Sequence, residues 1–288
     1  MTLFDSPTVL VQGITGHHGA FHTKGMLEAG TNVVAGVTPG KGGQVVHELP
    51  VFNSVSEACS NFPALNTSVI FVPAAFAKNA VIEAIDAGIK QIVVITEGIP
   101  VHDALRMREY AEKHSVILVG PNCPGLIVPG SHKLGIIAAH ITSTGSTAII
   151  SRSGTLTYEL ADALTKHDIG QSIILGIGGD PVSGMNFIDA LKALEANTKT
   201  EQIIMVGEIG GTSEQRAADY IRKHVTKPVY GLVVGHSAPA GQTFGHAGAI
   251  VGTDAESASA KTGYLASAGL RMSSTLDELI GSITKNTA

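Results

Sequence analysis

Short apolar runs alternate with segments of helical length along this chain. Thr8–Gln12, Ser68–Val72 and Gln91–Ile95 are apolar runs of strand length, and a turn and then a helical segment follow each of them. Regular strand and helix alternation with short connections predicts a parallel, doubly wound α/β sheet. Parallel strands are buried on both faces, which explains why the runs are apolar throughout.

The same alternation resumes in the second half of the chain. Apolar runs are found at Thr147–Ile150, Gln171–Ile177, Gln202–Val206 and Pro228–Gly235. We therefore expect an N-terminal Rossmann-like domain followed by a flavodoxin-like parallel-sheet domain. The predicted boundaries are 1–124 for the first domain, 125–145 for a crossover without a clear period, and 146–288 for the second domain.

Composition narrows the classes of function. The net charge is −5, which argues against nucleic acid as a partner. We see neither an apolar stretch long enough to span a membrane nor a signal peptide, and two cysteines form no disulfide framework, so we expect a cytoplasmic protein. The twelve histidines are scattered without ligand spacing, and we predict no metal site.

Glycine-rich turns follow Thr8–Gln12 and the second predicted strand, Thr31–Gly36. Gly13, Gly16 and Gly19 form a G-x-x-G-x-x-G pattern, which differs from the dinucleotide-binding G-x-G-x-x-G pattern. Glycines at a helix start leave backbone N–H groups open to a phosphate, although a plain tight turn would have the same composition. Lys41 lies among glycines after the second strand, where it is either a phosphate-binding cation or a solvated turn residue.

A second anion-binding arrangement is predicted after the run at Thr147–Ile150. Ser153, Gly154 and Thr155 follow that strand and begin a helix. The positive end of the helix dipole would stabilise a phosphoryl group there. Ser and Thr are also favoured helix caps, and capping alone would explain these residues.

His246 lies between glycine and alanine, beyond the strand that ends at Gly235, and Glu208 follows the preceding strand. Strand ends of a parallel sheet meet at one edge, so a carboxylate would orient the imidazole and raise its basicity. The arrangement predicts a phosphohistidine site better than a Ser153–His246–Glu208 triad, because no G-x-S-x-G elbow surrounds Ser153. A loop histidine without a role is the alternative for His246 taken alone.

Eight motifs in order give the chain a specific resemblance. They are residues 13–22, 37–43, 96–100, 120–125, 151–156, 176–181, 207–211 and 245–250. Together they closely resemble the α subunits of succinyl-CoA synthetases (succinate–CoA ligases), from about Thr8 to Ile250. The resemblance implies that the N-terminal domain binds CoA and that the second domain carries the phosphohistidine.

The resemblance also assigns roles to single residues. His246 matches the phosphorylated histidine, Glu208 the glutamate that orients it, and Tyr158 a substrate-site residue. The positions that match the family's CoA contacts are Thr15, Gly16, His17, His18, Lys41, Ile95, Thr96 and Glu97.

The reaction implied is succinate + CoA + ATP or GTP ⇌ succinyl-CoA + ADP or GDP + phosphate, a step of the tricarboxylic acid cycle. We find no Walker loop or ATP-grasp pattern in the chain. The resemblance therefore implies a β subunit with an ATP-grasp fold that binds the nucleotide and Mg²⁺, in an αβ or (αβ)₂ assembly.

The chain departs from the family just before His246. Residues 240–245 carry no charge, where the family usually has a basic stretch, and residues 252–256 replace a Gly-Gly-Lys-Gly-like turn. Fewer cations weaken the attraction for anions. Two alternatives therefore stay open: a ligase for another short dicarboxylate such as malate or itaconate, and a CoA-binding homologue that is not a catalyst.

Overall fold

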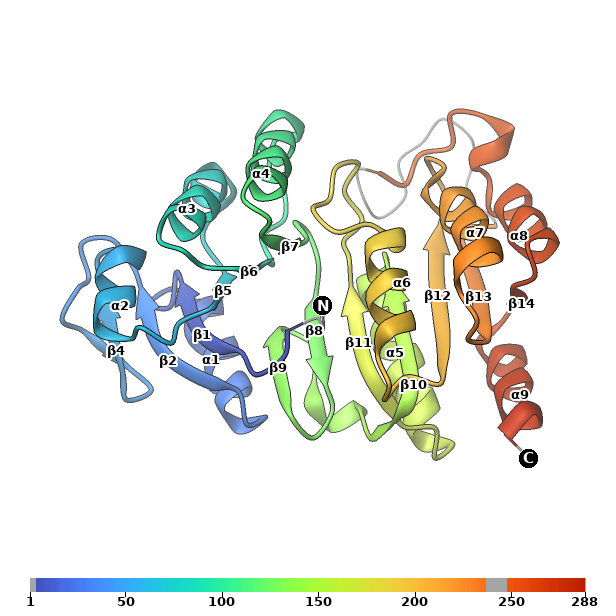
Figure 1. Ribbon diagram of the computed structural model, residues 1–288, viewed down its shortest axis with the longest axis horizontal. Coiled ribbons are helices and arrows are strands. Elements are labelled where there is room, and N and C mark those ends of the chain that lie inside the picture. The colour runs from blue at the N-terminus through green and yellow to red at the C-terminus, as the bar shows by residue number, and fades with distance from the viewer. Residues whose placement is uncertain (1–3, 237–247, 288) are drawn as a thin grey trace. The chain divides into compact units, whose positions relative to one another are not determined.

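The computed structural model describes residues 4–236 and 248–287. These residues divide into two compact units (Figure 1). The N-terminal unit comprises residues 4–139 and 182–185. The C-terminal unit comprises residues 140–181, 186–236 and 248–287. Each unit contains a mainly parallel sheet with helices on both faces, which confirms the predicted α/β class.

The N-terminal unit has the strand order of a Rossmann-like sheet. The strands of this sheet are β1 (Thr8–Gln12), β2 (Asn32–Val37), β3 (Val45–Val46), β4 (Leu49–Phe52), β5 (Thr67–Ile70), β6 (Gln91–Val94) and β7 (Ile117–Val119). Strands β8 (Gly125–Val128) and β9 (His132–Gly135) are not part of it and pair antiparallel with each other. The order β4-β2-β1-β5-β6-β7 is parallel throughout, and β3 pairs antiparallel with β4 at the edge. The chain reverses direction across the sheet between β1 and β5, where such folds bind ligands.

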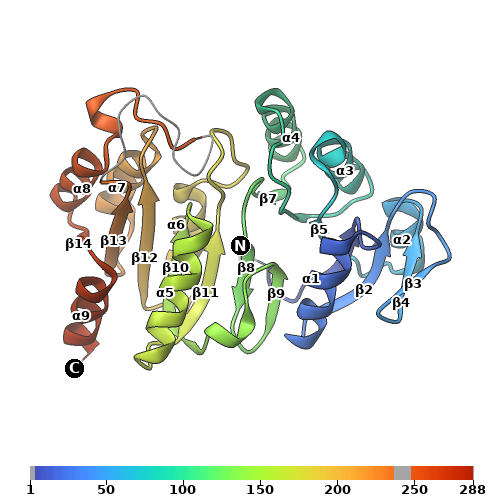
Figure 2. The ribbon, with the colours of Figure 1, turned by 180° about the vertical axis from the view of Figure 1, so that it is seen from behind.

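Four helices cover this sheet. They are α1 (His17–Glu28), α2 (Val55–Asn61), α3 (Ala74–Asp86) and α4 (Val101–Lys113). Helices α2, α3 and α4 lie on one face and α1 on the other (Figures 1 and 2). Pro73 and Pro100 precede α3 and α4, where a missing N–H costs nothing. A core of fully buried aliphatic side chains fills the space between α3, α4 and the sheet.

The C-terminal unit has the flavodoxin-like order β14-β13-β12-β10-β11. Its strands are β10 (Thr144–Ser151), β11 (Gln171–Gly176), β12 (Gln202–Glu208), β13 (Val229–Val234) and β14 (Arg271–Ser273). All the pairings among them are parallel. Every residue of β11 and β12 is buried, as the continuous apolar runs predict. Here the switch in strand order lies between β10 and β12.

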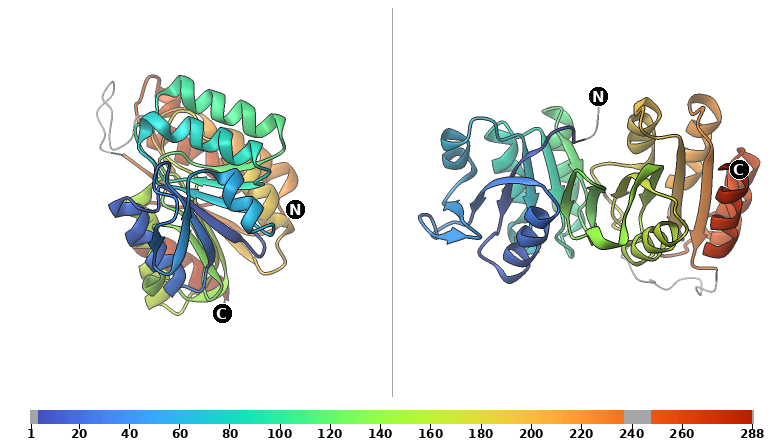
Figure 3. Two further views of the ribbon diagram at one scale, coloured as in Figure 1. Left: turned by 90° about the vertical axis from the view of Figure 1, so that its left-hand side faces the viewer. Right: turned by 90° about the horizontal axis from the view of Figure 1, so that it is seen from below.

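The helices of the C-terminal unit are α5 (Gly154–Lys166), α6 (Phe187–Ala196), α7 (Ser213–His224), α8 (Ala258–Ser267) and α9 (Leu276–Thr287). Helices α6 and α7 pack together on one face, and α5 and α9 on the other (Figures 1 and 2). Figure 3 shows the sheets and their helices from two further directions. Several helices begin at polar caps, among them Ser153 before α5, Asn186 before α6 and Ser257 before α8.

Some elements were not predicted from the sequence. The hairpin of β3 and β4, helix α2 and strand β14 have no counterpart among the predicted elements. The stretch 125–145 contains the antiparallel pair β8 and β9. These strands have two to four residues, which is too short for a period to be recognised.

Gly19 tests how tightly the first turn packs against α1. A Cβ atom at Gly19 would overlap the backbone carbonyl of Gly13. We expect Gly19→Ala to destabilise the chain by about 1–3 kcal/mol, because backbone atoms have to move. Gly281→Ala in α9 is the matched control. The new methyl group meets nothing within 4 Å there, so the helix should gain about 0.5–1 kcal/mol. Urea unfolding of both variants measures their free energies of unfolding. Equal values for the two variants would contradict the close packing of Gly19 against Gly13.

Candidate functional site

A cavity opens at the switch point of the N-terminal unit. Its volume is about 660 Å³, and it lies between the turn after β1 and the turn after β5. The lining residues are Gln12, Gly13, residues 15–19, residues 37–39, residues 71–73, Phe76, Asn79, Ala80 and Glu83. The cavity is therefore bounded by strand ends, by the first turn of α1 and by α3, with an apolar wall at residues 71–73 and Phe76.

The glycine-rich turn forms one side of this cavity. Gly13 has a positive φ of 84°, and the N–H of Gly16 donates to its carbonyl at 3.0 Å. Helix α1 then begins at His17, and its first residues line the cavity. The N–H groups at a helix start and the helix dipole both favour an anionic group. The cavity therefore combines an apolar wall with a site suited to phosphate.

The structure places the predicted CoA contacts in three groups. Thr15, Gly16, His17 and His18 line the cavity. Lys41 is exposed in the turn that continues from the wall at residues 37–39. Residues 95–97 are not among the lining residues.

Thr96 nevertheless touches the wall. Its hydroxyl donates to the carbonyl of Val72, a lining residue, at 2.6 Å. The described geometry thus places Thr96 behind the cavity wall.

Three aromatic rings form a stack beside the cavity. His22 is stacked between His18 and Phe71, with ring centroids 6.4 and 5.6 Å away. Burial, followed by the charges of Lys133 and His18, lowers the pKa of His22 to about 4. The His22 imidazole is therefore neutral at pH 7, and it supports the Phe71 ring by packing and not by charge.

At the switch point of the C-terminal unit, Ser151, Arg152 and Ser153 connect β10 to α5. The Ser153 hydroxyl accepts a hydrogen bond from the N–H of Leu156 at 3.3 Å and so caps the helix. Residues 153–155 thus begin a helix at the carboxyl edge of the sheet, as predicted. The use of the hydroxyl as a cap argues against Ser153 as a nucleophile, and capping by itself accounts for the serine at this position.

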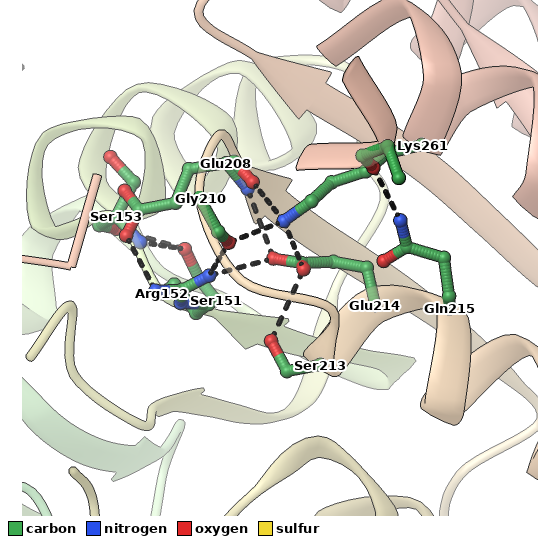
Figure 4. Close-up of polar contacts among 10 residues, drawn as sticks. Ser151, Arg152, Ser153, Glu208, Gly210, Ser213, Glu214, Gln215 and Lys261 are labelled. Carbon is green, nitrogen blue, oxygen red and sulfur yellow. Dashed lines mark hydrogen bonds and ion pairs between the residues drawn. The ribbon is translucent and has the colours of Figure 1, made fainter. Parts of the chain in front are cut away.

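Beside this helix start lies a buried group of four charged side chains, Arg152, Glu208, Glu214 and Lys261, which we call the ion cluster (Figure 4). Arg152 Nη2 lies 3.3 Å from Glu208 Oε1, and Arg152 Nη1 lies 3.0 Å from Glu214 Oε1. Lys261 Nζ lies 2.5 Å from Glu214 Oε2. Two cations and two anions balance, so burial of the charges is compensated within the group.

Glu214 is ionised within this cluster. Burial opposes its charge, but the attraction of Arg152 and Lys261 outweighs burial and lowers the pKa of Glu214 below its ordinary value. Tyr158, on α5, is half-buried, and burial raises its pKa to about 12. Its hydroxyl therefore remains protonated at neutral pH.

His246 lies outside the described residues, so its contacts remain a prediction. The chain is described again from Gly248, two residues further on. A Cβ atom at Gly248 would lie 3.1 Å from Arg152 Nη2 and 2.6 Å from the Gly179 carbonyl oxygen. The segment that follows His246 therefore passes directly beside Arg152 in the ion cluster.

Sequence reasoning overlooked three members of the ion cluster. Arg152 lies inside the motif at residues 151–156 without a predicted role of its own, and no motif includes Glu214 or Lys261. The pattern of the helices does mark Glu214 and Lys261 as unusual. Glu214 occupies the buried face of α7 with Ala217, Ala218 and Ile221, and Lys261 occupies that of α8 with Ala258 and Leu265. A charge at a core position of an amphipathic helix indicates a buried ionic partner.

Among the residues that the structure describes, no group of histidine, cysteine and acidic side chains is arranged to hold a metal ion. No helix within residues 4–236 and 248–287 is long and apolar enough to cross a membrane.

Comparison with known proteins defines the class. Residues 5–98 match the CoA binding domain family, and residues 150–271 match the CoA-ligase family. The ATP citrate lyases of Methanothrix soehngenii and Methanosaeta concilii superpose with TM-scores of 0.88 and 0.89 at 24% and 25% identity. The match covers 97% of this chain and 49% of each lyase chain.

Closer relatives are α subunits named succinate–CoA ligase [ADP-forming]. The Aquifex aeolicus protein is 53% identical over 91% of this chain and 86% of its own length. The Archaeoglobus fulgidus α subunit 1 is 46% identical over 98% of this chain and 96% of its own length. The Staphylococcus aureus protein is 49% identical over 94% of this chain and 89% of its own length. The chain belongs to the family of succinate–CoA ligase α subunits.

Replacement of Glu214 by Gln tests the charge balance of the ion cluster. Glu214→Gln leaves two buried cations facing one carboxylate, and we expect a loss of about 3–5 kcal/mol in the free energy of unfolding at pH 7. Because the pKa of Glu214 is lowered in the folded protein, its carboxylate stabilises the fold fully above the ordinary carboxyl pKa. This stabilisation is lost as the pH falls through the pKa that Glu214 has in the folded protein. The difference in free energy of unfolding between variant and wild type should therefore become smaller in acid.

Urea unfolding of variant and wild type, from pH 7 into acid, measures this difference in free energy. Glu159→Gln, at an exposed position on α5, is the control and should change stability little at any pH. A difference that becomes larger in acid would contradict the ionised state of Glu214.

Proposed function

We propose that this chain is the α subunit of an ADP-forming succinate–CoA ligase that works through a phosphohistidine at His246. The observation that carries the proposal is the pairing, in one chain, of two different switch-point sites. The N-terminal unit offers a cavity with a helix start suited to phosphate, and the C-terminal unit offers a helix start beside a cluster with Arg152 and Glu208. The identity to the named α subunits supports the same assignment.

The reaction needs an activated acid, because a carboxylate is a poor acylating agent. In the first step an imidazole nitrogen of His246 attacks the γ-phosphorus of ATP, and ADP leaves. A succinate oxygen then takes the phosphoryl group from the histidine, which gives succinyl phosphate. The thiol of CoA attacks the acyl carbon, phosphate leaves, and succinyl-CoA is formed.

The described residues support parts of this scheme. The N–H groups at residues 153–155 and the Arg152 guanidinium would stabilise the phosphoryl oxygens. Glu208 would orient the His246 ring and fix its tautomer. Gly248, two residues after His246 in the sequence, lies next to Arg152 at this edge of the sheet. Tyr158 is proposed as a substrate-site residue.

For CoA we propose the cavity of the N-terminal unit. Thr15, Gly16, His17 and His18 would contact the coenzyme directly, and Lys41 would reach a phosphate from the exposed turn. Ile95, Thr96 and Glu97 are proposed as a further CoA segment. Nucleotide and Mg²⁺ are assigned to a β subunit with an ATP-grasp fold, in an αβ or (αβ)₂ assembly.

One sequence observation bears on a second candidate, the same chemistry on another short dicarboxylate. Residues 240–245 have no positive charge before His246, where the family usually has a basic stretch. Fewer cations weaken the attraction for anions in general, and this departure from the family's pattern leaves the choice among short dicarboxylates open. Initial rates with succinate, malate and itaconate, measured on the complex with the β subunit, distinguish the candidates. Preference for malate or itaconate would replace succinate in the proposal.

His246→Ala tests the phosphoryl carrier. With the β subunit and ATP labelled at the γ-phosphate, we expect the wild-type chain to become labelled and the variant to take up no label, while CoA affinity stays within about twofold. His236→Ala is a control at another histidine that follows β13. A wild-type chain that binds CoA but is never labelled would identify a homologue without catalysis. Loss of CoA binding in His246→Ala would contradict the separation of the two sites.

Lys41→Ala tests the CoA assignment. Removal of one phosphate contact should weaken CoA binding by about tenfold at low salt, and the effect should shrink as salt screens the charge. Lys90→Ala is the matched control, because Lys90 is an exposed lysine that precedes β6 at the amino edge of the same sheet. Titration calorimetry measures both affinities, and an unchanged affinity for Lys41→Ala would remove this residue from the site.

A further inference from the structure

Lys261 is a fully buried lysine whose hydrogen bonds all go to one edge of the sheet. It projects from α8, and its exposed fraction is 0%. Its ammonium donates to the carbonyls of Glu208 and Gly210 at 2.7 Å each and to Glu214 Oε2 at 2.5 Å. A lysine has three N–H donors, and these three acceptors use all of them.

The first effect of these bonds is to hold the turn after β12. Gly210 has a positive φ of 86° and Gly211 of 59°, so this turn depends on glycine. Lys261 holds the turn by two carbonyls, and the N–H of Gly210 donates to the carbonyl of Glu256 at 3.0 Å. Glu208 is the last residue of β12. The side chain of Lys261 therefore fixes the backbone that carries the Glu208 carboxylate.

The second effect reaches the same carboxylate by another route. Glu214 accepts from Lys261 with one oxygen and from Arg152 with the other. Arg152 in turn pairs with Glu208 Oε1 at 3.3 Å. Lys261, Glu214, Arg152 and Glu208 thus form a closed ring of contacts (Figure 4), in which both the backbone and the side chain of Glu208 are held.

Stability alone does not explain this arrangement. Well-packed apolar side chains can replace buried ion pairs with little or no loss of stability. Here the buried charges converge on the turn that follows β12, beside the capped start of α5 and next to Gly248. Their contacts therefore give positional control at the edge where the phosphoryl group is proposed to bind.

We propose that Lys261 is a positioning residue for phosphoryl transfer, which acts by holding Glu208 and Arg152 in place through the Glu208–Gly210 turn and Glu214. This inference rests on the proposed function, because Glu208 orients His246 only if His246 carries the phosphoryl group. Lys261 itself would touch neither substrate nor phosphate.

The test uses Lys261→Met in the complex with the β subunit, because Met keeps an unbranched side chain and removes the ammonium. We expect the initial rate of His246 labelling from γ-labelled ATP to fall by about 10–100-fold, the usual effect of losing a supporting contact. The kcat of the ligase should fall in parallel, while the KM and affinity for CoA stay within about twofold. A folded variant labelled at the wild-type rate would overturn the proposal.

The chain offers a matched control in Lys227. This half-buried lysine also donates to two backbone carbonyls, those of Leu194 and Asn197, at 2.7 Å each, but it precedes β13 at the amino edge of the sheet. Lys227→Met should leave the labelling rate within about twofold of the wild type. An equal fall in both variants would show a general loss of structure and would overturn the positioning role.

A double variant separates positioning from folding. Lys261→Met with Glu214→Gln removes one positive and one negative charge together, so Arg152 and Glu208 remain as a balanced pair. We expect the thermal unfolding temperature of the double variant to return toward that of the wild type, while the rate of His246 labelling stays low. Recovery of the wild-type rate, or failure of the double variant to fold, would overturn the proposal. Absence of label in the wild-type complex would instead refute the proposed function itself.

Discussion

Parallel strand pairing organises both sheets. The strands that lead into helices run the same way within each sheet, so the turns that follow them leave the sheet at its carboxyl edge. The glycine turn after β1, the serine turn after β10 and the glycine turn after β12 all follow this rule. Both candidate sites therefore lie where the strand order reverses, between β1 and β5 and between β10 and β12.

The two switch points differ in the physical chemistry of their walls. The cavity of the N-terminal unit has a helix start and an apolar wall, in which Phe71 is backed by the neutral ring of His22. These features suit a large ligand with aromatic and phosphate parts. The edge of the C-terminal unit is lined by balanced buried charges and a capped helix start, which suit a small anion held in one orientation. A coenzyme and a transferred phosphoryl group need sites of these two kinds.

The sequence predicted what depends on local pattern. The apolar runs predicted most of the parallel strands, and the loops that follow them predicted where the cavity and the helix start would lie. Short edge strands such as β3 and β14 were not predicted, because two or three residues show no recognisable period. Glu214 and Lys261 were not recognised as functional candidates for another reason. Their importance depends on a contact between α7 and α8, and only their positions on the buried helix faces hinted at it. His246 remains a prediction, because it lies outside the described residues.

In the proposed scheme, phosphoryl transfer to the protein precedes acyl transfer and is separable from it. Isotope exchange between ADP and ATP, catalysed by the complex with the β subunit, measures the first transfer alone. We expect rapid exchange with Mg²⁺ in the absence of both succinate and CoA, because the phosphohistidine forms without them. Exchange that occurs only when succinate and CoA are both present would contradict a phosphorylated intermediate on this chain.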